Sequence, residues 1–240
     1  MPRANRLTVE GGLLHLTHRC HNRQFHLKFA RDRNDYRARL RSALKELDVS
    51  LLDYCLTCNH VHLLVDANER DQVSRLVQTV SGGFARAYNR RKQRTDAVWG
   101  DHFHATYIDT GVYLQRCVRY IELNMVRCGK VQHPREWEWL GYHEIMGHRT
   151  RSRLLDLDRL CWRLGGINLP QLRNHLEEGL NRVIDERKQE REPWWTESIA
   201  VGRSEFVEGM RRYVPHRRYV QTENPSHGIY TLRETPAPYG

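Results

Sequence analysis

Residues 58–65 read Cys-Asn-His-Val-His-Leu-Leu-Val, and this stretch decides how the first half of the chain is organised. Its length and apolar content predict a β-strand, on which successive side chains point to opposite faces of a sheet. His60 and His62 therefore project from one face, and the apolar residues that alternate with them point into a core. Two imidazoles on one face can share a metal ion, but two half-buried histidines held by hydrogen bonds would give the same pattern.

Residues 109–129 predict one helix, which Asp109 or Thr110 can cap at its start and Gly129 can end in a left-handed conformation. One stripe of this helix is apolar and comprises Leu114, Cys117, Val118, Ile121 and Met125. A second stripe, roughly 120° to 140° away, comprises Tyr113, Arg116, Tyr120, Asn124 and Arg127. The core stripe is complete without Tyr120, so a role in packing does not explain why this tyrosine stands among arginines and a carboxamide.

A tyrosine, two histidines and a carboxamide together indicate phosphodiester chemistry. A phenol with a pKa near 10 is a poor nucleophile, but it attacks a phosphodiester once its proton is removed. A divalent metal would make the phosphate electrophilic, and Arg116 and Arg127 would bind its negative charge. The product would be a covalent phosphotyrosine, which conserves the energy of the broken bond for later strand joining.

Four stretches carry a resemblance to a known family: MPRANRLTVEGGLLHLTHRCHNRQ (1–24), YCLTCNHVHLLV (54–65), VWGDHFHATYID (98–109) and YIELNMVRCGKV (120–131). In their order and spacing the chain resembles the single-tyrosine HUH, or IS200-like, transposases, and in particular the REP-associated tyrosine transposases. The resemblance implies that His60 and His62 are a metal-binding pair, that Asn124 is the third ligand and that Tyr120 is the nucleophile. It implies Mg²⁺ or Mn²⁺ as the cofactor, and imidazole ligands suit Mn²⁺ better.

The activity implied by this resemblance is that of a metal-dependent DNA transposase or nickase. Such an enzyme cleaves and rejoins single-stranded, hairpin-containing, REP-like DNA through a 5′-phosphotyrosine intermediate. Thr57-Cys58, Met125 and Cys128 depart from the family, which usually has Met-Pro, Pro and Ala at these places, but no functional group is lost. The alternative is a domesticated, non-catalytic protein that binds hairpin DNA. A zinc hydrolase is disfavoured because no glutamate stands beside the histidines to act as a base.

The order of predicted elements indicates an α+β, ferredoxin-like fold with a split β-α-β-β-α-β pattern. The predicted strands span 12–19, 51–57, 60–66 and 103–109, and the predicted helices span 34–48 and 71–92, ahead of the tyrosine helix. The pattern predicts an antiparallel sheet with helices on one face, which leaves the other face for metal and DNA. We expect a catalytic domain over 1–150, a mostly helical extension over 151–215 and an irregular or disordered tail over 216–240.

The charge of the chain favours a polyanionic partner. Its net charge is +10, and residues 1–150 hold 24 Lys and Arg against 16 Asp and Glu, which places +8 in the expected catalytic domain. Single-stranded or hairpin DNA is the partner that this charge and the resemblance imply, although arginine-rich faces are often merely solvated. The candidate DNA-binding residues are Arg3, Arg6, Arg19, Arg23, Arg86, Arg90, Arg91, Lys92, Arg94, Arg116 and Arg127.

The remaining expectations concern location, thiols and assembly. We find no run of about 18 apolar residues and no signal-peptide core at the N-terminus, so we expect no membrane span and a cytoplasmic protein with reduced cysteines. Cys55-x-x-Cys58 lacks a convincing second ligand pair for a zinc site, which favours buried structural thiols. The family includes homodimers as well as single-chain sites, and the sequence leaves both open.

Overall fold

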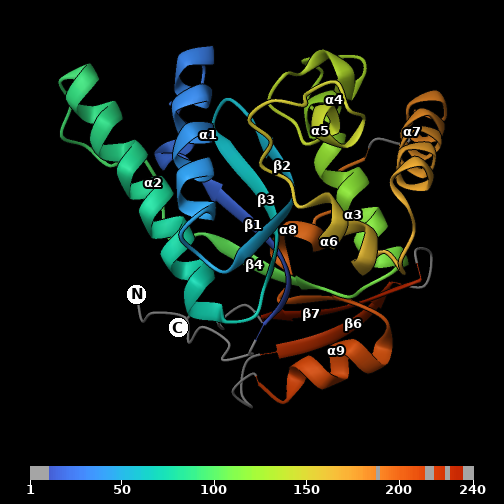
Figure 1. Cartoon of the computed structure of the whole chain (residues 1–240). Helices are drawn as coiled ribbons and strands as arrows, with labels where there is room; N and C mark the ends of the chain where they lie inside the picture. Colours follow the sequence, from blue (N-terminus) through green and yellow to red (C-terminus); the bar gives the residue numbers. More distant parts are fainter. Residues whose placement is uncertain (1–10, 188–189, 214–218, 225–227, 235–240) are drawn as a thin grey trace.

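The computed structural model describes residues 11–187, 190–213, 219–224 and 228–234. Its first part follows the predicted β-α-β-β-α-β order (Figure 1). The elements are β1 (Gly12–Arg19), α1 (Ala30–Leu44), β2 (Val49–Leu56), β3 (His60–Ala67), α2 (Arg70–Lys92) and β4 (His104–Ile108), with a short 3₁₀ turn η1 (His21–Arg23) after β1. The α+β, ferredoxin-like fold is therefore confirmed, although α1 begins four residues before the predicted helix 34–48.

The histidine strand β3 occupies an interior position in the sheet. It pairs antiparallel with β2 on one side and with β1 on the other, and β4 continues the sheet antiparallel to β1. In this register His62 lies opposite Thr17 of β1 and opposite Cys55 of β2. Because both neighbouring strands are hydrogen-bonded along β3, the direction in which His60 and His62 point is fixed by the ladder.

The tyrosine helix is interrupted where the sequence predicts one continuous helix over 109–129. It begins as α3 (Val112–Glu122), breaks at Leu123 (φ −79°, ψ 0°) and resumes as α4 (Asn124–Arg127). Gly111 rather than a side-chain cap precedes α3, whereas Gly129 adopts the expected left-handed conformation with φ 67°. The break falls between Tyr120 and Asn124, so the two residues stand on separate helical segments.

Both faces of the sheet carry helices. His15 and His18 point to opposite faces of β1 because an odd number of positions separates them. His18 Nδ1 lies 3.1 Å from Ser81 Oγ of α2, so α1 and α2 cover this face. His15 instead contacts Tyr120 of α3 and the backbone of Trp195, which belongs to α8 (Trp194–Glu197). The prediction of helices on one face is confirmed for α1 and α2, while α3 and α8 cover part of the other face.

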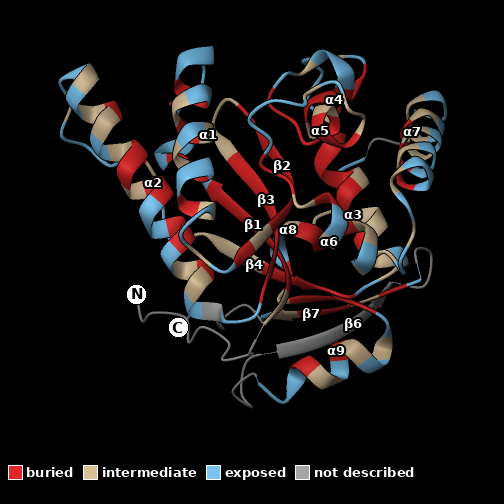
Figure 2. Ribbon diagram, viewed as in Figure 1, coloured by how far each residue is buried: buried red, intermediate tan, exposed pale blue. Residues whose placement is uncertain are grey.

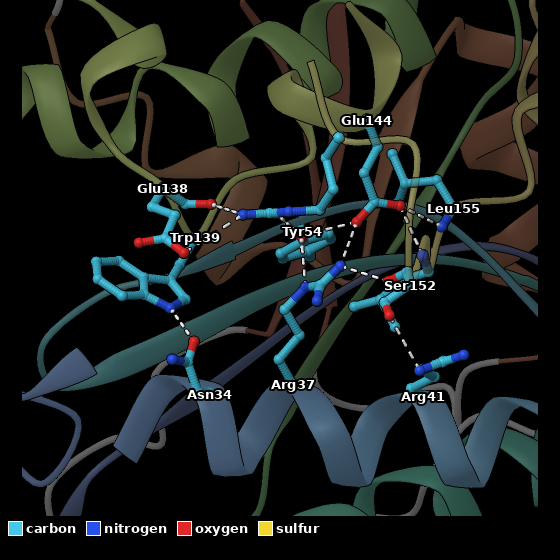
Figure 3. Close-up of polar contacts among 11 residues, drawn as sticks. Asn34, Arg37, Arg41, Tyr54, Glu138, Trp139, Glu144, Ser152 and Leu155 are labelled. Carbon is cyan, nitrogen blue, oxygen red and sulfur yellow. Dashed lines mark hydrogen bonds and ion pairs between the residues drawn. The ribbon is translucent and has the colours of Figure 1, made fainter. Parts of the chain in front are cut away.

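A polar network joins the segment after α4 to the first half of the chain. This segment contains η2 (Pro134–Glu136) and α5 (Tyr142–Ile145), and Glu144 of α5 is buried. Glu144 accepts hydrogen bonds from the Tyr54 hydroxyl and the Arg37 guanidinium, each at 3.0 Å, and from the backbone of Leu154 and Leu155 (Figure 3). One buried carboxylate therefore connects α1, β2, α5 and the chain that follows.

The second half of the chain extends the sheet. Its elements are α6 (Leu157–Arg163), α7 (Leu169–Asp185), α8, β5 (Ala200–Gly202), α9 (Ser204–Arg211), β6 (Tyr219–Asn224) and β7 (Ile229–Glu234). The seven described strands form one sheet in the order β2-β3-β1-β4-β5-β7-β6, in which β5 pairs parallel with β4. The prediction of an irregular tail over 216–240 is therefore wrong for 219–224 and 229–234; apart from Gly228, the rest of that tail lies outside the described residues.

Helices and strands of both halves contribute to one buried interior (Figure 2). Asp66 of β3 is buried and accepts hydrogen bonds from the guanidinium groups of Arg159 and Arg163, which attaches α6 to the sheet. Among the residues that the structure describes, no helix is both long and apolar enough to cross a bilayer.

Candidate active site

The first candidate ligand, His60, has a defined tautomer. Its Nδ1 lies 2.7 Å from the carboxamide oxygen of Asn59 and 3.0 Å from the hydroxyl of Thr57. A carboxamide oxygen only accepts, so the proton of the neutral imidazole is on Nδ1. The lone pair on Nε2 is therefore available to bind a metal, and the ring lies 4.8 Å from that of His62, centroid to centroid.

The second candidate ligand, His62, belongs to a chain of hydrogen bonds that crosses from β3 to α8. His62 Nδ1 lies 2.9 Å from His15 Nε2, and His15 Nδ1 lies 2.8 Å from the backbone oxygen of Trp195. The carbonyl oxygen must accept, so His15 Nδ1 donates to it, and His62 Nδ1 in turn donates to His15 Nε2. This chain fixes the tautomer of His62 and leaves the lone pair of its Nε2 pointing away from β1.

The third candidate ligand, Asn124, meets His62 directly. Its amide nitrogen lies 2.9 Å from His62 Nε2, which is the distance of an N–H donating to a lone pair. The structure thus brings together His60, His62 and Asn124 from β3 and α4, as the resemblance implies. The carboxamide can also present its oxygen after rotation of the amide group, because the two ends are nearly the same size.

All three histidines of this centre are held neutral. Burial is the main cause: it lowers the pKa of His15 to about 4 and that of His60 to about 3, and it holds the pKa of His62 well below its usual range. The positive charges of Arg19 and Arg127 lower the pKa of His60 further. Neutral imidazoles can accept a metal, but the two arginines oppose a dication until an anionic substrate supplies compensating charge.

Tyr120 lies beside this centre and is buried. The side chain is 6% exposed, and its ring centroid lies 6.0 Å from that of His15, 6.1 Å from that of His62 and 6.3 Å from that of Trp195. The sequence places Tyr120 outside the apolar stripe of the helix, yet the side chain is buried. Its stripe faces the histidines and α8 rather than the core between α3 and β2.

Two opposing effects act on the Tyr120 hydroxyl. Burial raises its pKa above the ordinary value, and the positive charge of Arg127 and a hydrogen bond with the Thr196 side chain lower it. The Arg127 guanidinium carbon stands 4.1 Å from the centre of the tyrosine ring and donates to the Tyr120 backbone oxygen at 2.5 Å. Arg127 is thus the cation placed to stabilise the phenolate form of Tyr120.

The donor set fits a divalent metal with a limited number of protein ligands. Two imidazole nitrogens and one carboxamide oxygen would leave further coordination positions on the metal for oxygens of water or substrate. Because two of the protein ligands are imidazoles, this set suits Mn²⁺ better than Mg²⁺. Within the described part of the chain, no cluster of three or more His, Cys, Asp and Glu side chains could hold a metal. A metal at this centre would therefore depend on the carboxamide of Asn124.

A polar groove of about 630 Å³ opens beside the tyrosine. Its lining includes Thr17, which contacts His62, and Thr196, which contacts Tyr120. Arg19 and Arg23 contribute positive charge to it, whereas Arg191 is paired with Glu197. Two of the predicted DNA-binding residues, Arg19 and Arg23, therefore lie where a phosphate backbone would approach Tyr120.

The other candidate DNA-binding residues are dispersed. Those on and after α2 are Arg86, Arg90, Arg91, Lys92 and Arg94, and none of them lines this groove. Arg91 is ion-paired with buried Asp32, and Arg94 lies 3.6 Å from Asp96. Arg116 is half-buried on α3. Arg3 and Arg6 lie outside the described residues.

Sequence reasoning missed three groups of this site: His15, the Trp195–Thr196 pair and Arg191. A signal for His15 exists, because His15, Thr17 and Arg19 alternate along the strand that flanks the histidine strand. Trp195, Thr196 and Arg191 carry no comparable signal, because nothing in the local pattern of 190–198 places that segment against β1.

Comparison with known proteins identifies a family model and solved structures that this chain resembles. The family model for IS200-like transposases matches residues 8–124, and no curated protein sequence matches the chain. Among solved structures, a REP-associated tyrosine transposase bound to a REP hairpin matches with a TM-score of 0.54 and 19% identity, over 66% of this chain and 90% of its own. A candidate transposase from Deinococcus radiodurans covers 43% of this chain at 17% identity with a TM-score of 0.34, too low to bear on the fold. Residues 8–124 of this chain thus resemble the IS200-like transposases, and the chain shares the fold of the REP-associated tyrosine transposase.

Proposed function

We propose that this protein cleaves and rejoins single-stranded DNA that carries a hairpin, using Tyr120 as the nucleophile. The observation that carries the proposal is the meeting of Tyr120 with His62, which in turn contacts His60 and Asn124, beside a groove that Arg19 and Arg23 line. A hairpin-containing substrate is supported by the structural relative, which was solved with a REP hairpin bound.

The chemical step is a transesterification at phosphorus. The Tyr120 oxygen forms a bond to the scissile phosphate, the bond from phosphorus to the 3′ oxygen breaks, and the phenol loses a proton while the leaving 3′ oxygen gains one. Arg127, above the tyrosine ring, stabilises the phenolate that attacks. The reverse reaction, in which another 3′ hydroxyl attacks the 5′-phosphotyrosine, joins strands without an external energy source.

A divalent metal held by His60, His62 and Asn124 would polarise a non-bridging oxygen of the scissile phosphate. The protein's own contribution is to orient the two imidazoles. His62 is oriented through His15 and the Trp195 carbonyl, and His60 through Asn59 and Thr57. Arg19 and Arg23 hold the DNA backbone in the groove.

The test uses 5′- and 3′-labelled single-stranded oligonucleotides that contain hairpins from repeats flanking the gene. Purified protein is mixed with them in Mn²⁺, and the products are separated on denaturing gels. We expect a protein–DNA adduct that keeps the 3′ label, because the tyrosine is joined to the 5′ phosphate of the downstream fragment. Tyr120→Phe and a chelator should each abolish it, whereas Tyr113→Phe, on the same helical stripe, should leave it intact.

Binding to several such hairpins without an adduct or cleavage would contradict the proposal. That outcome would favour the alternative function, a domesticated protein that binds hairpin DNA without catalysis. An adduct that still forms with Tyr120→Phe would support the proposed activity but would show that another residue is the nucleophile.

A further inference from the structure

A cavity of about 570 Å³ lies on the opposite face of the sheet from Tyr120. Its wall is formed by α2, through Ser74, Gln78, Ser81 and Gly82, and by the loop from Trp99 to Phe103 that leads into β4. The volume falls within the roughly 300–1,000 Å³ that is usual for sites that bind small organic groups. The mechanism above uses none of these α2 residues.

The cavity has the lining of a site for a flat, polar ring. The imidazole of His18 stacks on the indole of Trp99, with ring centroids 4.5 Å apart and planes 20° apart. Both rings are held: His18 Nδ1 lies 3.1 Å from Ser81 Oγ, and the Trp99 indole donates to the Ser81 backbone oxygen at 2.9 Å. Around these rigid aromatic groups, the exposed side chains of Gln78 and His102 offer donors and acceptors.

The same loop connects this cavity to the groove beside Tyr120. Gly100, Asp101 and His102 line both spaces, so the loop is the wall between them, and all three residues are exposed. A polynucleotide in the groove can therefore pass over the loop and place one of its bases on the other side. The strand ladder explains the arrangement, because Thr17 and Arg19 face the groove while His18, between them, faces the cavity.

Gly82 supplies an independent observation. A glycine inside a helix is unfavourable relative to alanine, so its presence in the middle of α2 calls for a reason. Packing does not supply one, because a Cβ at this position would meet only the flexible end of Arg86, at 3.5 Å. The neighbouring Gly83 differs, since a Cβ there would come within 2.9 Å of the Arg39 guanidinium. The absence of a side chain at Gly82 keeps the cavity open.

We propose that this cavity binds an unstacked nucleobase of the single-stranded DNA that lies in the groove, next to the scissile phosphate. This inference rests on the proposed function, because it takes the DNA in the groove as given. The base would stand against the aromatic pair and bond to Gln78 and His102, so the site would help to choose which phosphate reaches Tyr120.

The test is a scan of the single-stranded flank of a hairpin oligonucleotide with abasic sites, one position at a time. Dissociation constants are measured by fluorescence anisotropy at one fixed salt concentration for the wild type, for Gly82→Leu, which fills the cavity, and for Thr79→Leu. Thr79 is an exposed residue of α2 outside the cavity and serves as the matched control. We expect one abasic position to weaken wild-type binding about tenfold. An abasic site at the same position should not weaken the binding of Gly82→Leu any further, whereas Thr79→Leu should show the same tenfold loss as the wild type.

Equal abasic penalties in the wild type and in Gly82→Leu at every position would overturn the inference. Gln78→Trp fills the cavity from an exposed position and provides a second test if Gly82→Leu does not fold. The Tyr120 adduct is assayed on the same oligonucleotides. Equal penalties together with a normal adduct would contradict the base site alone. A position-specific penalty without any adduct would support the base site and contradict the proposed catalysis.

Discussion

The amide nitrogen of Asn124 lies 2.9 Å from Nε2 of His62, so this hydrogen bond joins a helix to a strand across 62 positions of sequence. The imidazole lone pair that a metal would use is thus occupied by an amide donor. Rotation of the carboxamide would replace this donor with an oxygen ligand and would need no movement of the backbone. The centre can therefore alternate between a hydrogen-bonded state and a metal-binding state at Asn124.

Asn124→Asp should increase the affinity for Mn²⁺ about tenfold or more in the absence of DNA. A carboxylate cannot donate to His62, suits Mn²⁺ better than a neutral amide, and offsets the charge of the nearby arginines. Asn124→Leu should lose measurable binding. Titrations followed by electron paramagnetic resonance of free Mn²⁺ would measure both, and equal affinities for all three proteins would show that Asn124 is not a ligand.

His15→Phe should lower the Mn²⁺ affinity by about 10- to 100-fold, since partners that orient a ligating histidine usually have effects of this size. Phenylalanine keeps a ring at the position but removes the hydrogen bonds to His62 and to the Trp195 carbonyl. His15→Gln, which can still donate and accept, should lie between the wild type and His15→Phe. If His15→Phe binds Mn²⁺ as well as the wild type does, the hydrogen-bonded chain does not orient His62.

Glu122→Gln should stabilise the protein at pH 8 by about 2 kcal/mol and have little effect at pH 4. Glu122 and Asp53 are both buried, and their two carboxyl groups interact with each other. Burial raises the pKa of Asp53 to about 7 and that of Glu122 well above its usual range. Both groups thus bind protons more tightly in the folded state, and their contribution to stability is lost as the pH rises from about 4 through 7.

Urea denaturation of the wild type and Glu122→Gln at pH 4, 6 and 8 would measure this difference. Glu178→Gln, at an exposed position of α7, is the matched control and should show no such pH dependence. A constant difference between wild type and Glu122→Gln across this range would contradict the raised pKa values.

Arg23→Ala should weaken DNA binding and reduce the slope of log K against log salt by about one, as expected for the loss of a single phosphate contact. Arg23 is exposed and lines the groove beside Tyr120. Arg211→Ala, at an exposed position of α9, is the control. Binding isotherms at four salt concentrations would give the slopes, and parallel lines for wild type and Arg23→Ala would exclude this contact.

The sequence predicts the N-terminal half of the fold because its signals are local. Strand β1 occupies the predicted residues, and the alternation around His60 and His62 alone shows that both side chains point to the same face. The approach of Asn124 to His62 is a tertiary contact, and only the family resemblance implied it. The break at Leu123 was missed because Leu123 is a good helix former and nothing in its neighbourhood marks a stop.

The second half was harder to predict because its strands depend on distant partners. Ala200–Gly202 is only three residues long and becomes a strand because β4 and β7 lie on either side of it. A segment of that length has no periodicity to read. For the same reason, the burial of Tyr120 beneath Trp195 could not be predicted from the helix pattern of 109–129 alone.

The carbonyl of Trp195 that orients His15 has a consequence for the order in which the working protein comes into being. Synthesis proceeds from the N-terminus, so His60, His62 and Tyr120 leave the ribosome well before the residue that holds His15 in place. Strand β5 also has to emerge before β4 gains its second neighbour. A chain terminated between Asn124 and Trp195 would therefore carry His60, His62, Tyr120 and Asn124 but not the carbonyl that orients His15, and such a truncated product should lack the proposed activity.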